Sequence, residues 1–255
     1  MSVSFADGDY ELVYGEKYST ESGELNVEMP KLVYSGFVNS ENAELIGLTD
    51  ALNIKYKVGA NFIDATTQMD AGSHVLAITS NKSEFTNYLV DVSATKSVIV
   101  TPKEIYVTAG ETFVKTVDGN WSVELNANNY VINGLIAKDA NTTNALNVIF
   151  TARISSLEPG NTTVIMTING ISGSQSANYV LSSEDEYKTI TIPAIIKELA
   201  VVSFDEDSYL FAFDNTPKSI VPTIKEGSMQ DGVKYVIKYQ GRRFDGVDYI
   251  EQVSA

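Results

Sequence analysis

The stretch that decides the fold is DAGSHVLAITSNKSEFTNYLVDVSATKSVIVTPKEIYVTA, residues 70–109. Short runs in which apolar and polar residues alternate are typical of half-buried β-strands, and the small polar clusters between the runs favour turns. A second stretch with a similar order of runs, PGNTTVIMTINGISGSQSANYVLSSEDEYKTITIPAIIKELAV, follows at residues 159–201. Since one pattern of strands and turns occurs twice, we predict that the chain consists of repeated units.

Two motifs give the spacing of the first two units. Asn87-Tyr88 returns as Asn178-Tyr179, an offset of 91 residues (178 − 87). SVIVTP, which ends at Pro102, matches TITIPA, which ends at Ala194. Proline lacks the N–H donor that a strand interior needs, so we expect Pro102 and Pro193 to end strands and the next unit to begin almost at once. Such short joints predict a stiff rod.

A third unit opens like the first. VSFADGDYELVYG, which begins at Val3, aligns without a gap with VSFDEDSYLFAFD, which begins at Val202, at an offset of 199 residues (202 − 3). The chain therefore divides into units at 1–102, 103–195 and 196–255. The third unit stops near the turn that should precede its last strands, so we expect either a shortened unit or one that a strand from another chain completes.

All three units are predicted to be β in character. Several short strands per unit, separated by turn residues, predict an all-β fold with one β-sandwich per unit, each folded on its own core. Residues 39–52 are the one segment that suggests a helical turn. The clearest predicted strands are HVLAIT (74–79), YLVDVS (88–93), SVIV (97–100), TVIMTI (163–168), KTITI (188–192) and KYVIKY (234–239).

Composition and charge argue against several classes of function. Lys and Arg total 18 against 33 for Asp and Glu, and the net charge of −15 opposes binding to nucleic acid or to an anionic membrane surface. The chain has no cysteine, which excludes disulfides and thiolate chemistry. No apolar run approaches the roughly 20 residues of a transmembrane helix, and the N-terminus does not resemble a signal peptide. We expect no membrane insertion and interpret the chain as an excerpt of a longer protein.

The sequence offers few candidates for chemistry. His74 is the single histidine, and neither a nucleophile elbow nor a phosphate-binding glycine loop is present. We therefore predict no catalytic, cofactor-binding or metal-binding residues and no enzymatic activity. Acidic turns supply oxygen ligands that suit Ca²⁺, so we name them as candidates for calcium binding. None has the full spacing of a calcium-binding loop, so we assign no residue as a metal ligand. These turns contain Asp7 and Asp9; Glu184, Asp185 and Glu186; Asp205, Glu206 and Asp207; and Asp245 and Asp248.

The order of the motifs resembles the bacterial MBG family, whose members are Ig-like repeats of large cell-surface and secreted proteins. The first unit carries the resemblance in Tyr14-Gly15, Asp70-Ala71-Gly72, Asn87-Tyr88 and Val100-Thr101-Pro102. The second unit resembles the related YDG repeats, with KTVDGN (115–120), Pro159-Gly160, Asn178-Tyr179 and Ile192-Pro193-Ala194. The third unit, YLFAFDNTPKSIVPTI (209–224), has Asp214 where the family usually has glycine. The resemblance implies tandem Ig-like β-sandwiches arranged end to end, with no catalytic residues.

We predict a non-enzymatic structural or adhesive spacer (stalk) module of a large bacterial cell-surface or secreted protein, located outside the cell. Its partners would be a protein or a glycan at a surface, or neighbouring copies of itself. One alternative is a virion or surface-layer building block that self-assembles through its Ig-like domains. Another is a carbohydrate-binding module, in which Trp121 and other aromatic residues would form a platform for a sugar. Packing across strands is the simpler role for most of the aromatic residues.

Overall fold

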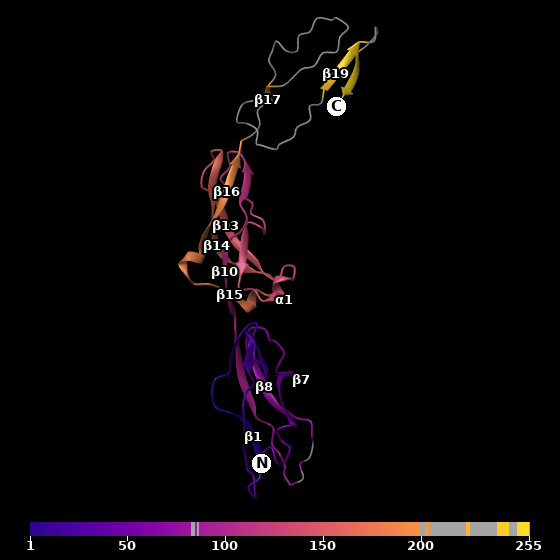
Figure 1. The fold of residues 1–255 in the computed structure, drawn as a ribbon, viewed down its shortest axis with the longest axis vertical. Coiled ribbons are helices and arrows are strands. Elements are labelled where there is room, and N and C mark those ends of the chain that lie inside the picture. The colour runs from indigo at the N-terminus through magenta and orange to yellow at the C-terminus, as the bar shows by residue number, and fades with distance from the viewer. Residues whose placement is uncertain are drawn as a thin grey trace.

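The computed structural model describes residues 1–82, 85, 87–198, 202–203, 223–224, 239–244 and 249–254. Within them the chain is mostly β, with several small sheets and a single α-helix, α1 (Ala137–Ala140). Two groups of strands follow one another along the long axis of the molecule (Figure 1). We call residues 1–101 the first group and residues 103–197 the second group.

The first group is built around a five-stranded sheet with the order β2-β9-β8-β6-β7, and β1 with β5 and β3 with β4 form two smaller sheets. In β9 the burial alternates along the strand, so Val98 and Val100 face inward, as the alternating sequence predicts. These two side chains belong to the same buried cluster as Val3 and Phe5 of β1. The strands are β1 (Ser2–Phe5), β2 (Glu11–Val13), β3 (Lys17–Ser19), β4 (Asn26–Glu28), β5 (Leu32–Ser35), β6 (Leu52–Val58), β7 (Asn61–Asp64), β8 (Gly72–Ser80) and β9 (Thr95–Thr101).

The second group has a four-stranded sheet with the order β11-β16-β14-β13 and a three-stranded sheet with the order β12-β10-β15. Val107 of the smaller sheet packs in one buried cluster with Val164, Met166 and Ile192 of the larger sheet. The two sheets therefore share a core. The elements are β10 (Lys103–Ala109), β11 (Phe113–Thr116), β12 (Tyr130–Asn133), α1, β13 (Asn147–Ile154), β14 (Gly160–Ser172), the 3-10 helix η1 (Ser176–Asn178), β15 (Tyr179–Leu181), the 3-10 helix η2 (Asp185–Tyr187) and β16 (Thr189–Lys197).

The two groups share one arrangement of strands. β2 runs parallel to β9, and β11 runs parallel to β16 in the same place. Beyond these pairs, β9, β8 and β6 are antiparallel, as are β16, β14 and β13. In the smaller sheets, β1 pairs with β5 in the first group, and β10 pairs with β12 in the second. The segment that contains or follows the tyrosine of each Asn-Tyr pair runs parallel to the first strand of its group, by a single bridge to β1 and as strand β15 beside β10. The repeated motifs of the sequence thus occupy equivalent places in the two groups.

The prediction that each unit folds on a core of its own is wrong where the two groups meet. The buried cluster of the first group continues into the second and includes Ile105, Ile136 and Tyr179. A second cluster, with members from both sheets of the second group, contains none of these three residues. The first core therefore holds the two groups together as well as the first group itself.

Pro193 does not end a strand, contrary to the prediction, but lies inside β16. In an antiparallel ladder, hydrogen-bonded and non-hydrogen-bonded residue pairs alternate. The Ile168 N–H bonds to the Lys188 carbonyl, so these two residues form a hydrogen-bonded pair. Counted from that pair along the register, Thr163 and Pro193 form a non-hydrogen-bonded pair. The nitrogen of Pro193 therefore faces away from β14, and on that side β11 pairs only from Ala194 onward. The missing N–H costs no ladder bond, which explains why the strand continues.

The predicted strand at 88–93 is also wrong, because this segment makes only isolated bridges, one of them between Ser2 and Asp91. Residues 39–51 form turns, and two helical i to i+4 backbone bonds close them, from the Ile46 N–H to the Asn42 carbonyl and from the Leu52 N–H to the Leu48 carbonyl. Most of the third unit lies outside the described residues, including most of KYVIKY, so the strand-completion prediction stays a prediction. What is described there is β17 (Val202–Ser203) paired with β18 (Thr223–Ile224), and β19 (Tyr239–Phe244) paired with β20 (Tyr249–Ser254).

Candidate functional site: the joint between the two groups

The first part of the joint is a pair of tyrosines that share one buried carboxylate. Tyr14 follows β2 at the end of the first group, and Tyr179 opens β15 in the second group. The Tyr14 hydroxyl donates to Asp139 Oδ2 at 2.9 Å, and the Tyr179 hydroxyl donates to the same oxygen at 2.7 Å. The two rings meet edge to face with their centroids 5.3 Å apart. Hydrogen bonds from two donors offset the cost of burying Asp139, which is only 3% exposed.

The second part of the joint is the amide of Asn178, which bonds to the first group in two directions. Its Oδ1 atom accepts the Ala71 N–H at 2.7 Å, and its Nδ2 atom donates to Asp70 Oδ1 at 3.0 Å. The same nitrogen donates to Gln175 Oε1 at 2.7 Å within the second group. Asn178 is buried whereas Asp70 is exposed, so these bonds are partly shielded from competition with water.

Gly15 allows the close approach of the two groups. Its φ of +104° lies in the region that favours glycine, and a Cβ atom on it would stand 2.8 Å from Cγ2 of Ile136 in the second group. Its carbonyl accepts a bond from Gln68 Nε2 at 2.6 Å, which fixes the turn from the side of the first group. Ile136 is buried beneath this turn. A larger residue at position 15 would therefore push the groups apart.

The electrostatics of the joint keep both tyrosines in the donating form. Burial, with the hydrogen bond to Asp139 as the second cause, raises the pKa of Tyr14 well above its usual 10. Burial and the same carboxylate raise the pKa of Tyr179 in the same direction. Both hydroxyls therefore stay protonated and continue to donate to Asp139 up to a higher pH than an ordinary tyrosine would.

Sequence reasoning identified part of this joint and missed the rest. Tyr14-Gly15, Asp70-Ala71 and Asn178-Tyr179 all belong to the motifs that carry the family resemblance, and the structure brings them together. Asp139 and Ile136 were missed, because an acidic residue in INGLIAKDANTT carries no sign of burial. The available signal was a three-residue spacing between an apolar residue and a carboxylate, seen as Val38 and Glu41 in the first unit and as Ile136 and Asp139 in the second.

His74 lies in β8 and is half-buried, as expected for a strand position. Its Nε2 atom bonds to the Asp70 carbonyl at 2.7 Å, and its ring meets Tyr56 edge-on with centroids 6.0 Å apart. A backbone carbonyl is neither a nucleophile nor a carboxylate that could orient a catalytic base. These contacts give His74 a structural role.

The acidic turns are separated in the structure. Asp7 and Asp9 lie in the exposed loop after β1, and Glu184 to Glu186 lie in and beside η2. Within the part of the chain that the structure describes, no three residues of the types that bind metals come together. The clusters at 205–207 and 245–248 lie outside the described residues, so calcium binding stays untested.

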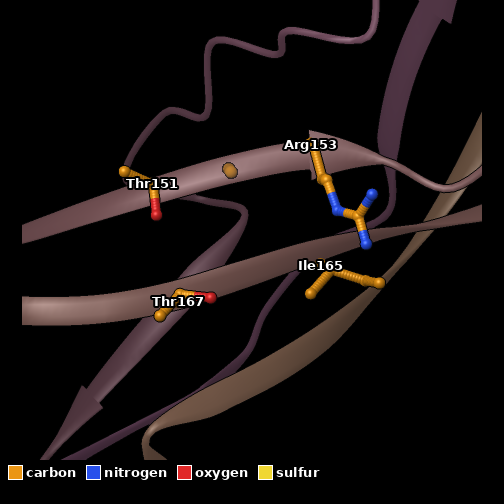
Figure 2. A pocket seen from close by; sticks show the side chains of 5 residues that line it. Thr151, Arg153, Ile165 and Thr167 are labelled. Carbon is orange, nitrogen blue, oxygen red and sulfur yellow. The ribbon is translucent and has the colours of Figure 1, made fainter.

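Figure 2 shows a shallow hollow of about 190 Å³ on the face of the β13–β14 pair. Thr151 and Arg153 of β13 face Ile165 and Thr167 of β14 across it. The lining has two hydroxyls and one guanidinium but no carboxylate that could act as an acid or base, so it lacks the paired carboxylates of glycoside hydrolysis. Trp121 is about half exposed, and its backbone carbonyl accepts the Ile154 N–H at 3.0 Å.

Comparison with known proteins gives no relative for this chain: no family model, no curated protein and no solved structure matches it. The resemblance to MBG and YDG repeats therefore stays a prediction. Among the described residues, no helix has the length and apolar character to span a membrane. The joint brings buried polar side chains into contact between the two groups, and we treat it as the candidate functional site.

Proposed function

We propose that the chain is a non-enzymatic spacer of a large bacterial surface or secreted protein, made of Ig-like β-sandwiches joined end to end as a rod. In this role it holds a protein-binding or glycan-binding element at a distance from the cell. The observation that carries the proposal is the joint, in which the side chains of Tyr14, Asp139, Asn178 and Tyr179 are buried and hydrogen-bonded. Domains in one chain usually move relative to one another unless their interface is large and well packed. A core that continues across the joint supplies that restraint here.

A spacer gains reach only when its joints resist bending, so the rigidity of this joint is the property to measure. The chain has no cysteine, so two introduced cysteines can carry spin labels without competing reactions. Val58 in β6 and Ile149 in β13 are exposed and lie in different groups. Double electron–electron resonance between labels at Val58→Cys and Ile149→Cys reports the distribution of distances across the joint.

A matched pair within the first group, Val33→Cys with Val58→Cys, gives the width that the labels themselves contribute. The proposal predicts that the distribution across the joint is as narrow as the distribution within the first group. A distribution across the joint that is several times broader would show two groups on a hinge, and the spacer proposal would then lose its basis.

A further inference from the structure

The first group carries a second copy of the Tyr–carboxylate arrangement, at the end away from the joint. The Tyr88 hydroxyl accepts the Val38 N–H at 3.0 Å and donates to Glu41 Oε2. At the joint, the Tyr179 hydroxyl accepts the Ile136 N–H at 3.2 Å and donates to Asp139 Oδ2. In both places one tyrosine hydroxyl links a backbone N–H to the carboxylate three residues later. We call Val38, Glu41, Asn87 and Tyr88 the end face.

The two arrangements are equivalent by register as well as by chemistry. Val3 pairs with Tyr34 in the first group, and Val107 pairs with Ile132 in the second. The step from Tyr34 to Ile132 is 98 residues (132 − 34), the same step that leads from Val38 to Ile136 (136 − 38). The Asp91 N–H bonds to the Met1 carbonyl, just as the Ser182 N–H bonds to the Ile105 carbonyl. Met1 therefore holds the place in the first group that Ile105 holds in the second.

The two arrangements differ in what covers them. Val38 is 54% exposed, whereas its counterpart Ile136 is 6% exposed because Gly15 of the first group lies against it. Glu41 and Tyr88 are half-buried and Asn87 is exposed, whereas their counterparts at the joint are all buried. Beside the end face, Leu89 is 91% exposed. The N-terminus lies at this end, since the Met1 amino group bonds to the Leu89 carbonyl (Figure 1).

We propose that the end face binds the Tyr-Gly end of another unit built like residues 1–102, joined in series as the first group is joined to the second. This inference rests on the proposed spacer function and names the partner of its free end. The incoming tyrosine hydroxyl donates to Glu41, the glycine turn packs on Val38, and a backbone N–H of the incoming unit donates to the amide oxygen of Asn87. A second copy of the whole chain does not offer this end, because its own second group already covers Tyr14 and Gly15.

The register gives the design of the test. Because Met1 occupies the place of Ile105, residues 1–104 are fused directly ahead of Met1 of the full chain, which reproduces the natural spacing between a unit and the next. The probe is Val38→Cys in the following copy, the only cysteine in the fusion. Its rate of reaction with a maleimide is compared with that of the same substitution in the chain without the fusion.

We expect the maleimide reaction at position 38 to be about tenfold slower in the fusion, in line with the exposed fractions of 54% and 6% for Val38 and Ile136. Ile99→Cys, at an exposed position on β9 away from the end face, should react at the same rate in both proteins. Insertion of a six-residue Gly-Ser linker ahead of Met1 should restore the fast rate at position 38. Circular dichroism of each variant confirms that it is folded.

Equal rates at position 38 with and without the fusion would overturn the proposal. Slowing that persists in the linker variant would also overturn it, because general crowding by the added unit would then be the cause. Tyr14→Phe in the added copy provides a second measurement, since it removes the donor to Glu41 and should return part of the lost rate. Spin-label distances across the natural joint do not depend on the fusion, so the end-face proposal can fail while the spacer proposal stands.

Discussion

Tyr14→Phe removes one hydroxyl from the joint and leaves the ring in place. The lost bond joins a neutral donor to the buried Asp139 carboxylate at 2.9 Å. A hydrogen bond to a charged group contributes about 1.5–3 kcal/mol, and the carboxylate keeps the Tyr179 hydroxyl as its other donor. We therefore expect the free energy of unfolding to fall by about 2 kcal/mol.

The assay is urea denaturation followed by circular dichroism, with calorimetry to show whether the two groups unfold together. A loss of about 2 kcal/mol corresponds to a decrease in Tm of about 4–8 °C for a structure of this size. Tyr56→Phe is the matched control, because Tyr56 is buried in the first group and its hydroxyl has no hydrogen-bond partner in the described structure. The control separates the loss of a hydroxyl at the joint from the loss of any buried hydroxyl.

The reasoning would be refuted if Tyr14→Phe were as well tolerated as Tyr56→Phe. That result would mean that the Asp139 carboxylate gains no stability from the Tyr14 hydroxyl. A loss of stability with no broadening of the spin-label distances would have a different meaning. The bond would then stabilise the first group without fixing its orientation relative to the second.

Four further predictions follow from single features of the structure. Tyr56→Phe should itself raise the free energy of unfolding by about 1 kcal/mol in urea titration, since an unpaired buried hydroxyl is costly. Gly15→Ala should lower Tm more than Gly8→Ala, because both have positive φ but only a Cβ at position 15 meets Ile136; equal losses would remove the close-approach argument. Leu76→Ala, in the core, should cost about 2–5 kcal/mol in urea titration, whereas Val75→Ala, its exposed neighbour in β8, should cost much less. Burial raises the pKa of Tyr18 to about 12, so the contribution of the protonated side chain to the free energy of unfolding is complete below pH 10 and is lost as pH rises toward 12. Urea titrations from pH 8 to 11 should therefore show the free energy of unfolding decreasing above pH 10, and a flat profile would contradict this.

The sequence predicts the β character and the repetition because both depend on local patterns. Alternation in SVIV places Val98 and Val100 inward in β9, and the Asn-Tyr pairs mark equivalent places in the two groups. The same alternation in YLVDVS produces half-buried positions. The backbone of this segment pairs with its neighbours only through isolated bridges, so no strand forms. Periodicity reports which side chains face inward and does not report whether a partner strand is present.

The joint could be predicted only in part, since its partners are far apart in the sequence. Tyr14 and Asp139 are separated by 125 residues, and no local pattern indicates that this carboxylate is buried. The effect of Pro193 likewise depends on residues that are distant in the sequence. Its effect depends on which side of β16 its nitrogen faces and on where β11 begins to pair, and neither is encoded near the proline itself.

The parallel pairing of β2 with β9 also determines how a unit would respond to pulling from its two ends. β2 lies toward the start of the first group and β9 is its last strand, so opposite forces on the chain termini slide these two strands past one another. Their hydrogen bonds then bear the load in shear, all at once, instead of opening one after another like a zipper. The second group repeats this geometry with β11 and β16, so a series of such units would meet tension with the same kind of mechanical clamp at every step.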